Sequence, residues 1–162
     1  MRRPERSLCG VDRWNVKTLQ DRPALLPVRT TTIRYLVSRP APHLLPRTRL
    51  PFERHIFRVT ASITLFRVAD DGDLHLVLRD PKGLYMIAEA PSPGCVNRST
   101  LLPKVQMLNA RRAASLCARP PGAPAVRAVV TGVAFFDFKH GQTGVAPNAI
   151  ELHPILKFSC IG

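Results

Sequence analysis

After residue 55, three short segments of this chain place a carboxylate within three residues of a histidine. Carboxylate and imidazole groups are the ligands of zinc, manganese and iron sites, and a bound metal can activate water for hydrolysis of a phosphodiester. The candidate catalytic residues are therefore Asp73, His75, Asp137, His140, Glu151 and His153. The candidate ligands for a divalent metal among them are His75, His140, Glu151 and His153.

Two of the pairs, Asp73 with His75 and Glu151 with His153, have the i, i+2 spacing that puts both side chains on one face of a strand. Leucine or isoleucine occupies the opposite face, so we expect both pairs to lie outside the hydrophobic core. A strand histidine close to a carboxylate is commonly a hydrogen-bonded structural pair. The pairs form a site only if the fold brings them together, so whether the chain is an enzyme stays open.

Alternation of hydrophobic and polar residues predicts a mainly β structure for residues 55–162. The expected elements are strands over 57–65, 73–80 and 84–90, a helix over about 101–118, and strands over 125–136 and 150–158. This is the order of the OB fold, a small five-stranded Greek-key barrel with a helix between its third and fourth strands. A small β-sandwich with one helix is the competing interpretation.

The last strand and the helix carry distinctive residues. Pro154 has no backbone N–H, so the last strand is expected at an edge of the sheet or with a bulge. The helix has an apolar face, made up of Leu101, Val105, Leu108 and Leu116.

Residues 1–54 contain seven of the 16 prolines of the 162-residue chain. Proline removes a backbone donor and restricts the residue before it, so long helices and central strands are not expected there. Residues 14–19 and 30–37 are short extended candidates whose apolar side chains need a surface to bury. The sequence therefore predicts two parts: an extended proline-rich N-terminal arm (1–54) that wraps the domain, and an OB-like barrel domain (55–162).

The chain carries 24 Lys and Arg against 11 Asp and Glu, a formal net charge of +13. This balance favours nucleic acid, anionic lipid or acidic polymers as partners, although a solvated basic surface has the same composition. An OB barrel binds single strands through its second and third strands and adjoining loops, using basic groups and stacking aromatic rings. The candidate ligand-binding residues in that region are Arg67, Arg79, Lys82 and Tyr85.

The four cysteines include no CxxC pair, so a zinc ribbon is not expected. Cys95 and Cys117 flank the expected helix and are a possible disulfide of an exported chain; buried free thiols are the alternative. The basic start MRRPERSLCG lacks the apolar segment of a secretory signal, which leaves the compartment open. No stretch approaches the roughly 20 apolar residues of a membrane helix, so no membrane span is expected.

Several motifs are found together in this chain: WNVKT at 14–18, DLHLVL at 73–78, MIAE at 86–89 and GVAFFDFKHGQTGVAPNAIELHP at 132–154. In these motifs the chain resembles a family of bacterial proteins without an assigned activity, many of them exported. The resemblance runs from about residue 9 to most of the remaining chain, and the last motif is its most specific part. It implies one compact domain that includes the arm, and it implies no catalytic role.

Three functions are compatible with these observations. The first is a basic OB-like module that binds single-stranded nucleic acid or another polyanion. The second is a metal-dependent, nuclease-like hydrolase that uses the histidine and carboxylate residues. The third is a structural or surface-interaction protein. Fold analogy alone does not decide between them.

Overall fold

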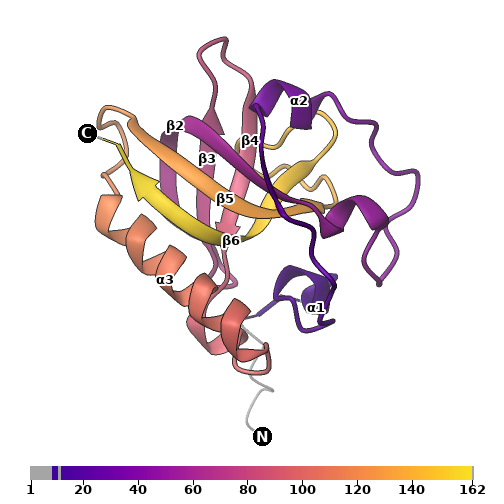
Figure 1. Cartoon of the computed structure of the whole chain (residues 1–162). Helices are drawn as coiled ribbons and strands as arrows, with labels where there is room; N and C mark the ends of the chain where they lie inside the picture. Colours follow the sequence, from indigo (N-terminus) through magenta and orange to yellow (C-terminus); the bar gives the residue numbers. More distant parts are fainter. Residues whose placement is uncertain (1–8, 11, 162) are drawn as a thin grey trace, which may run out of the picture.

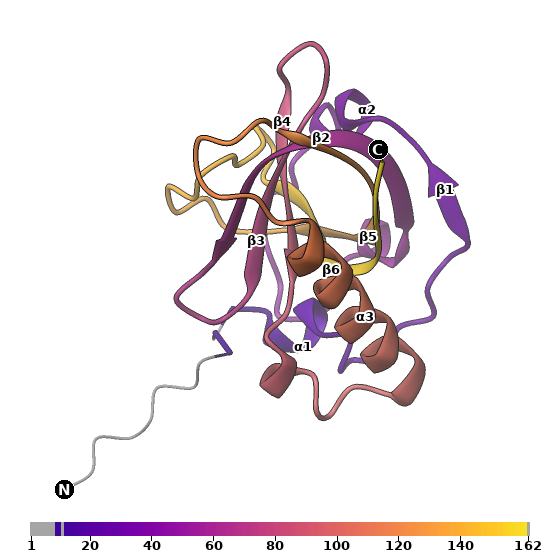
Figure 2. The ribbon, with the colours of Figure 1, turned by 90° about the vertical axis from the view of Figure 1, so that its left-hand side faces the viewer.

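The computed structural model describes residues 9, 10 and 12–161 and shows a five-stranded barrel with one long helix (Figure 1). The barrel strands are β2 (Ile56–Val68), β3 (Leu74–Arg79), β4 (Tyr85–Ala90), β5 (Val126–Phe136) and β6 (Ile150–Cys160). They pair in the order β2-β3-β4-β6-β5, and β5 pairs back with β2, which closes the barrel (Figure 2). No helix in the described part of the chain is long and apolar enough to cross a membrane.

The strand order and directions are those of the OB fold. β4 and β6 run parallel, whereas the other barrel pairs are antiparallel. Helix α3 (Leu101–Cys117) connects the third barrel strand, β4, to the fourth, β5, and packs on β6. The predicted mainly β, OB-like barrel with one helix is confirmed. The β-sandwich interpretation is wrong, because β2 pairs on both of its sides and joins the strands into a ring.

Alternating side chains of the strands fill the barrel interior. On β2, Phe57, Val59, Ala61 and Ile63 are buried, while the residues between them are partly or fully exposed. Burial of one such side chain stabilises the fold by about 1.5–3 kcal/mol. β3 and β6 differ from β2, because consecutive residues of both strands are buried over most of their length. Their outer faces are therefore covered by other parts of the chain.

The last strand, β6, lies between β4 and β5 rather than at an edge. The edge prediction for Pro154 is wrong, and the alternative of an irregular strand is correct. The register between β5 and β6 shifts on both sides of Gly132, where it faces residues 152–155. A Cβ on Gly132 would lie 2.8 Å from the Cβ of Leu152. A glycine is needed there because the two backbones approach so closely.

Helix α3 packs through small side chains. Its buried residues are Met107, Ala110 and Ala114. The predicted apolar face is not the buried face, since Leu101 is 77% exposed and Leu116 is 76% exposed. The short alanine side chains allow the helix to lie close to β6.

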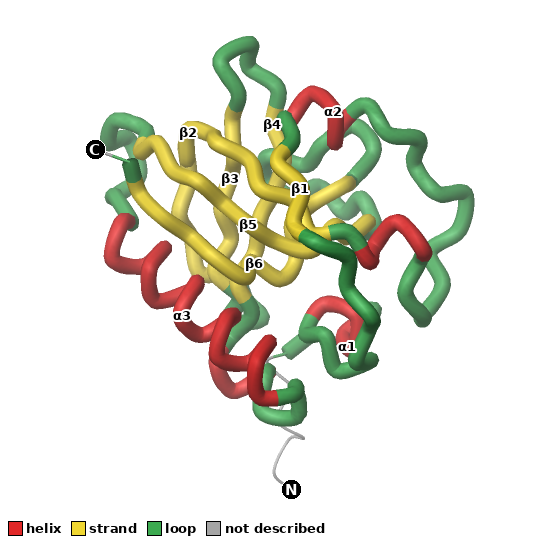
Figure 3. The backbone as a smooth tube through the Cα atoms, viewed as in Figure 1, coloured by secondary structure: helices red, strands yellow, loops and turns green. Residues whose placement is uncertain are grey.

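The N-terminal arm is partly helical, so the prediction of extended segments over 14–19 and 30–37 is wrong. The arm contains α1 (Trp14–Lys17), β1 (Val28–Thr30), α2 (Ile33–Val37) and the 3-10 helix η1 (Pro51–Arg54), with long loops after α1 and after α2 (Figure 3). Thr32 caps α2, because its hydroxyl oxygen accepts a hydrogen bond from the backbone N–H of Tyr35 at 3.1 Å. β1 adds a parallel strand beside the start of β2.

A buried ion pair joins the arm to the barrel. Arg13 Nη1 donates to Glu53 Oε2 at 2.7 Å and to the carbonyl oxygen of Phe136 at 2.9 Å. The carboxylate of Glu53 also accepts from the backbone N–H groups of Leu50 at 2.8 Å and Phe136 at 2.9 Å. Both charged side chains are almost completely buried. The pair thus connects the start of α1, η1 and the end of β5.

The disulfides are Cys9–Cys95 and Cys117–Cys160. The predicted Cys95–Cys117 bridge is wrong, and so is the alternative of free thiols. The end of β6 lies beside the end of α3, and the Cα atoms of Cys117 and Cys160 are 6.4 Å apart. The chain before α1 lies beside the 3-10 helix η2 (Pro93–Cys95), with the Cα atoms of Cys9 and Cys95 5.5 Å apart. Both separations are in the range that disulfides span.

Candidate functional site

A cleft of about 500 Å³ opens on the outer face of the barrel beside β3 and β4. Its walls include residues 69–71 of the loop between β2 and β3, and residues 137 and 140–142 of the loop between β5 and β6. An OB barrel binds oligonucleotides and oligosaccharides with this pair of strands and these two loops. We name it the acidic cleft, and the charged or titratable residues that line it are Lys17, Arg67, Asp70, Asp71, His75, Glu89, Asp137 and His140.

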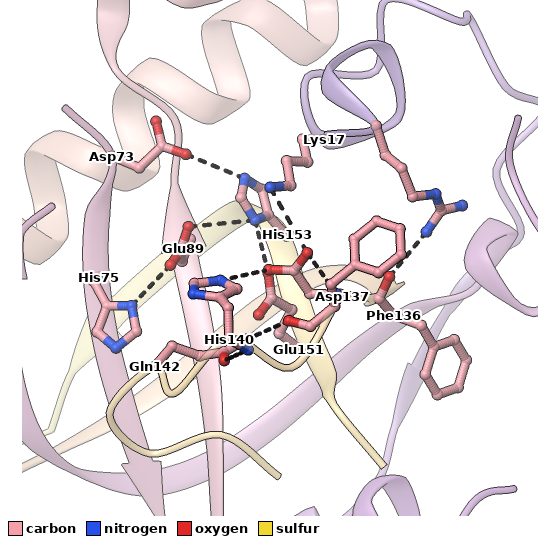
Figure 4. Close-up of polar contacts among 12 residues, drawn as sticks. Lys17, Asp73, His75, Glu89, Phe136, Asp137, His140, Gln142, Glu151 and His153 are labelled. Atoms are coloured by element: carbon pink, nitrogen blue, oxygen red, sulfur yellow. Dashed lines mark hydrogen bonds and ion pairs between the residues drawn. The ribbon is translucent and has the colours of Figure 1, made fainter. Parts of the chain in front are cut away.

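Three residues from neighbouring parts of the barrel meet directly behind the acidic cleft, and Glu89 is the one among them that lines it (Figure 4). Asp73 directly precedes β3, Glu89 lies on β4 and His153 lies on β6. Nε2 of His153 is 3.4 Å from Oδ2 of Asp73, and Nδ1 is 3.5 Å from Oε2 of Glu89. One potential ligand atom from each of the three residues lies within 4.8 Å of the others. This donor set could hold a metal ion.

Glu151 supports His153 from the same strand. Nδ1 of His153 donates to Oε1 of Glu151 at 3.0 Å, and both side chains are buried. Burial alone would lower the pKa of His153, but its contacts with Asp73 and Glu151 and the charge of Glu89 raise it to about 10. Burial raises the pKa of Glu151 to about 7, although the hydrogen bond from His153 opposes this shift. The protonation of His153 and that of Glu151 therefore depend on each other and on the neighbouring carboxylates.

His75 extends the cluster along β3. Its Nδ1 donates to Oε1 of Glu89 at 2.8 Å, and its Nε2 donates to the carbonyl oxygen of Thr143 at 2.9 Å. Because both partners are acceptors, both ring nitrogens carry hydrogen and the imidazole is cationic. Burial would lower the pKa of His75, but these hydrogen bonds and the charge of Glu89 raise it. Burial would raise the pKa of Glu89, but the bond from His75 and the charge of His153 lower it.

Asp137 and His140 form a second pair at the mouth of the acidic cleft. Nε2 of His140 lies 3.8 Å from Oδ2 of Asp137, and the His140 side chain is 66% exposed. Nζ of Lys17 lies 3.9 Å from Oδ1 of Asp137. Burial would lower the pKa of Lys17, but Asp137 and the carboxylates deeper in the cleft raise it. Lys17 thus brings a positive charge from the arm to the carboxylates of the barrel.

The structure brings together some of the sequence-predicted site residues, namely Asp73, His75, Glu151 and His153. Two residues that the sequence analysis missed, Glu89 and Lys17, connect them to each other and to the arm. The sequence did contain a signal for Glu89, because a hairpin that turns at 81–83 places residue 75 opposite residue 89. The sequence contained no such signal for Lys17, since only the path of the arm brings this residue to the cleft.

The expected position of the pairs outside the hydrophobic core is correct, but they are not on the surface. His75 is 2% exposed and His153 is fully buried. The loop after β5 crosses the outer face of β3, where the Thr143 carbonyl binds His75 and Gly144 packs on Val77. A polar pair under such a cover needs partners for all its hydrogen-bonding atoms, which is why carboxylates and imidazoles cluster there.

The loop that crosses the outer face of β3 is expected to require a glycine at position 144. It has a φ of +82°, and a Cβ would lie 2.6 Å from Cγ2 of Val77. We expect Gly144→Ala to lower the free energy of unfolding by about 2–4 kcal/mol, from left-handed strain and overpacking together. Gly141→Ala is the matched control, because Gly141 also has a positive φ of +80°, but no atom of the part of the chain that the structure describes lies within 4 Å of a Cβ there. Urea unfolding of both variants checks this; equal losses would contradict the role of the Val77 contact.

The predicted ligand-binding residues lie in two places. Arg67 is exposed at the rim of the acidic cleft. Arg79, Lys82 and Tyr85 lie in or beside the turn between β3 and β4 and are exposed. Tyr85 borders a second hollow of about 560 Å³, which Val77 and the loop residues 143–145 also line. Both hollows therefore lie along β3 and share the loop after β5 as a wall.

No protein-family model matches this chain, and no curated protein matches it. Solved structures with a similar fold include a protein of Leishmania major Friedlin assigned as an aspartyl-tRNA synthetase, with 16% identity and a TM-score of 0.48 over 82% of this chain. Another is the asparaginyl-tRNA synthetase of Entamoeba histolytica, with 11% identity and a TM-score of 0.47 over 85% of this chain. The chain corresponds to only 20% and 24% of the lengths of these two proteins. These matches do not bear on the chemistry of the acidic cleft.

Proposed function

We propose that the protein binds single-stranded nucleic acid on the outer face of β3 and β4. The observation that carries this proposal is the exposed pair of Tyr85 and Arg79 beside a hollow on that face. Tyr85 is 41% exposed, and the guanidinium carbon of Arg79 lies 5.5 Å from the centre of its ring. An exposed aromatic ring next to a cation is a platform on which a nucleobase can stack.

Cationic side chains around this face can contact the phosphates of the same strand. Lys82 lies in the turn beside Tyr85, and Arg67 and Lys17 line the acidic cleft at the other end of the face. The net charge of +13 would increase the rate at which a polyanion meets this surface. Since single-strand binding weakens with salt by a slope of about −0.7 per phosphate contact, four such contacts predict a roughly 50-fold loss of affinity from 50 to 200 mM salt.

The test is fluorescence anisotropy of the full chain with labelled single-stranded DNA and RNA oligonucleotides, titrated in salt and in EDTA. We expect salt-sensitive binding that Tyr85→Ala weakens by about 5–150-fold, the range for loss of one base-stacking contact. The matched control for loss of Arg79 is Arg112→Ala, which removes the same charge from the exposed side of α3. Arg79→Ala should weaken binding more than Arg112→Ala does.

Other results would replace this proposal. Binding that is absent at low salt would contradict the proposal and favour a structural or surface-interaction protein. Equal losses in Arg79→Ala and Arg112→Ala would contradict a site on this face. Shortening of the oligonucleotide with time, in Mn²⁺ but not in EDTA, would replace simple binding with the metal-dependent hydrolase.

A further inference from the structure

The carboxylates of the acidic cleft would repel any phosphate that approaches it. Four carboxylates line it against two permanently charged cations, Lys17 and Arg67. We propose that Asp73, Glu89 and His153 bind one divalent transition-metal ion, such as Mn²⁺ or Zn²⁺, directly behind the wall of this cleft, which Glu89 lines. The potential ligand atoms of these residues already lie within 4.8 Å of one another.

The orientation of His153 points to a ligand. Its Nδ1 donates to the buried carboxylate of Glu151 at 3.0 Å. Its Nε2 is buried, makes no hydrogen bond to the described residues and faces Oδ2 of Asp73 at 3.4 Å. Histidines that bind metals characteristically donate the other ring N–H to a carboxylate, which fixes the ring and leaves one nitrogen lone pair for the ion. The contact of Glu151 with Nδ1 supplies that anchor, and an ion bound at Nε2 would displace the proton that the raised pKa of His153 keeps on the ring.

Both carboxylates are held in the same manner. Oδ1 of Asp73 accepts a hydrogen bond from the backbone N–H of Ser92 at 2.9 Å, which leaves Oδ2 facing His153. Oε1 of Glu89 accepts from His75 at 2.8 Å, which leaves Oε2 facing His153. Each carboxylate therefore has one anchored oxygen and one oxygen that faces the His153 ring: Oδ2 of Asp73 lies nearest Nε2, and Oε2 of Glu89 lies nearest Nδ1.

The composition of the site indicates the class of metal. Two carboxylates and one imidazole suit Mn²⁺, Zn²⁺ or Fe²⁺, whereas Ca²⁺ and Mg²⁺ favour oxygen ligands alone. An entry path exists, because Glu89 lines the acidic cleft and its side chain is 16% exposed. Three protein ligands leave further coordination positions open to water or a phosphate oxygen.

This inference deepens the proposed function, because a divalent ion would let the acidic end of the face accept a phosphate of the bound strand. The metal site itself does not require that function, because its three ligands and their hydrogen-bond partners all belong to the protein. The experiment therefore measures metal binding alone, so that failure of one proposal is distinguishable from failure of the other.

The test is calorimetric titration of the full chain, freed of metal with EDTA and dialysed, with MnCl₂ and with ZnCl₂. We expect one ion per chain, a rise of the melting temperature on binding, and loss of affinity by at least about 100-fold in Asp73→Asn and Glu89→Gln. Bound Mn²⁺ should also lose the free-ion signal in electron paramagnetic resonance. The matched control is Asp70→Asn, which neutralises an exposed carboxylate of the same cleft outside the cluster and should leave the affinity unchanged.

Folding of the variants is checked by circular dichroism. If Asp73→Asn does not fold, Glu89→Gln decides the test, because Glu89 is partly exposed at the cleft wall. The proposal is overturned if neither ion binds at about 1 mM, a concentration that still detects weak sites. It is also overturned if Asp70→Asn weakens binding as much as the folded cluster variants do.

Discussion

Replacing Arg13 with methionine is expected to lower the free energy of unfolding by about 3–5 kcal/mol, because it leaves the Glu53 carboxylate buried without its counter-ion. Arg13 is 6% exposed and Glu53 is fully buried. Among the described residues, the carboxylate would retain only the backbone N–H groups of Leu50 and Phe136 as partners. Urea unfolding of the oxidised protein gives the free-energy difference.

The control for this prediction is Arg47→Met, which makes the same change at an exposed position of the arm and should alter stability by less than about 0.5 kcal/mol. Glu53→Gln should be as destabilising as Arg13→Met, since it leaves the guanidinium unpaired. The double variant should lose less than the sum of the two single losses, because the two residues act as one unit. Strict additivity, or a loss below about 1 kcal/mol for Arg13→Met, would show that the arm is held by other contacts.

Removal of either disulfide is expected to have an effect of similar size. The bridges join residues separated by 86 positions for Cys9–Cys95 and by 43 positions for Cys117–Cys160. Closing loops of these lengths in the unfolded chain corresponds to about 4–5 kcal/mol for each bridge in the chain-entropy model. Serine replacement of both cysteines of one bridge should therefore lower the free energy of unfolding by about that amount.

The two disulfide variants also test which cysteines are paired. Cys117→Ser/Cys160→Ser should leave a protein with no free thiol, and so should Cys9→Ser/Cys95→Ser, by thiol titration without reductant. Cys95→Ser/Cys117→Ser should leave two thiols without their partners in the fold. Two free thiols in either of the first two variants, or none in the third, would contradict the pairing. Because disulfides persist in oxidising compartments, unfolding in reductant gives the stability that the chain would have in a reducing one.

The sequence by itself determined the barrel. The two-residue period of β2, the Asp-Gly turn before β3 and the order of strands around the helix are local patterns, and each acts over a few neighbouring residues. The i, i+2 spacing likewise placed Asp73 with His75 and Glu151 with His153 on outward-facing positions of their strands. These features depend on backbone geometry, so they are readable without knowing what packs against them.

Only the tertiary structure decided what covers the outer face and which partners meet there. The helical form of the arm, the contact of Lys17 with Asp137 and the Arg13–Glu53 pair all depend on the path of the N-terminal arm over the barrel. The side of α3 that packs on β6 was set by the close approach of alanines rather than by the leucines.

The tertiary structure also decided the cysteine pairing and the cluster of Asp73, Glu89 and His153. Cys95 lies closer in sequence to Cys117 but pairs with Cys9. Asp73 precedes β3 and Glu89 lies on β4, whereas His153 lies on β6, which α3 and β5 separate from them along the chain. Sequence patterns report the periodicity of one segment at a time, whereas contacts between distant segments are set by how the whole chain fills space around the barrel.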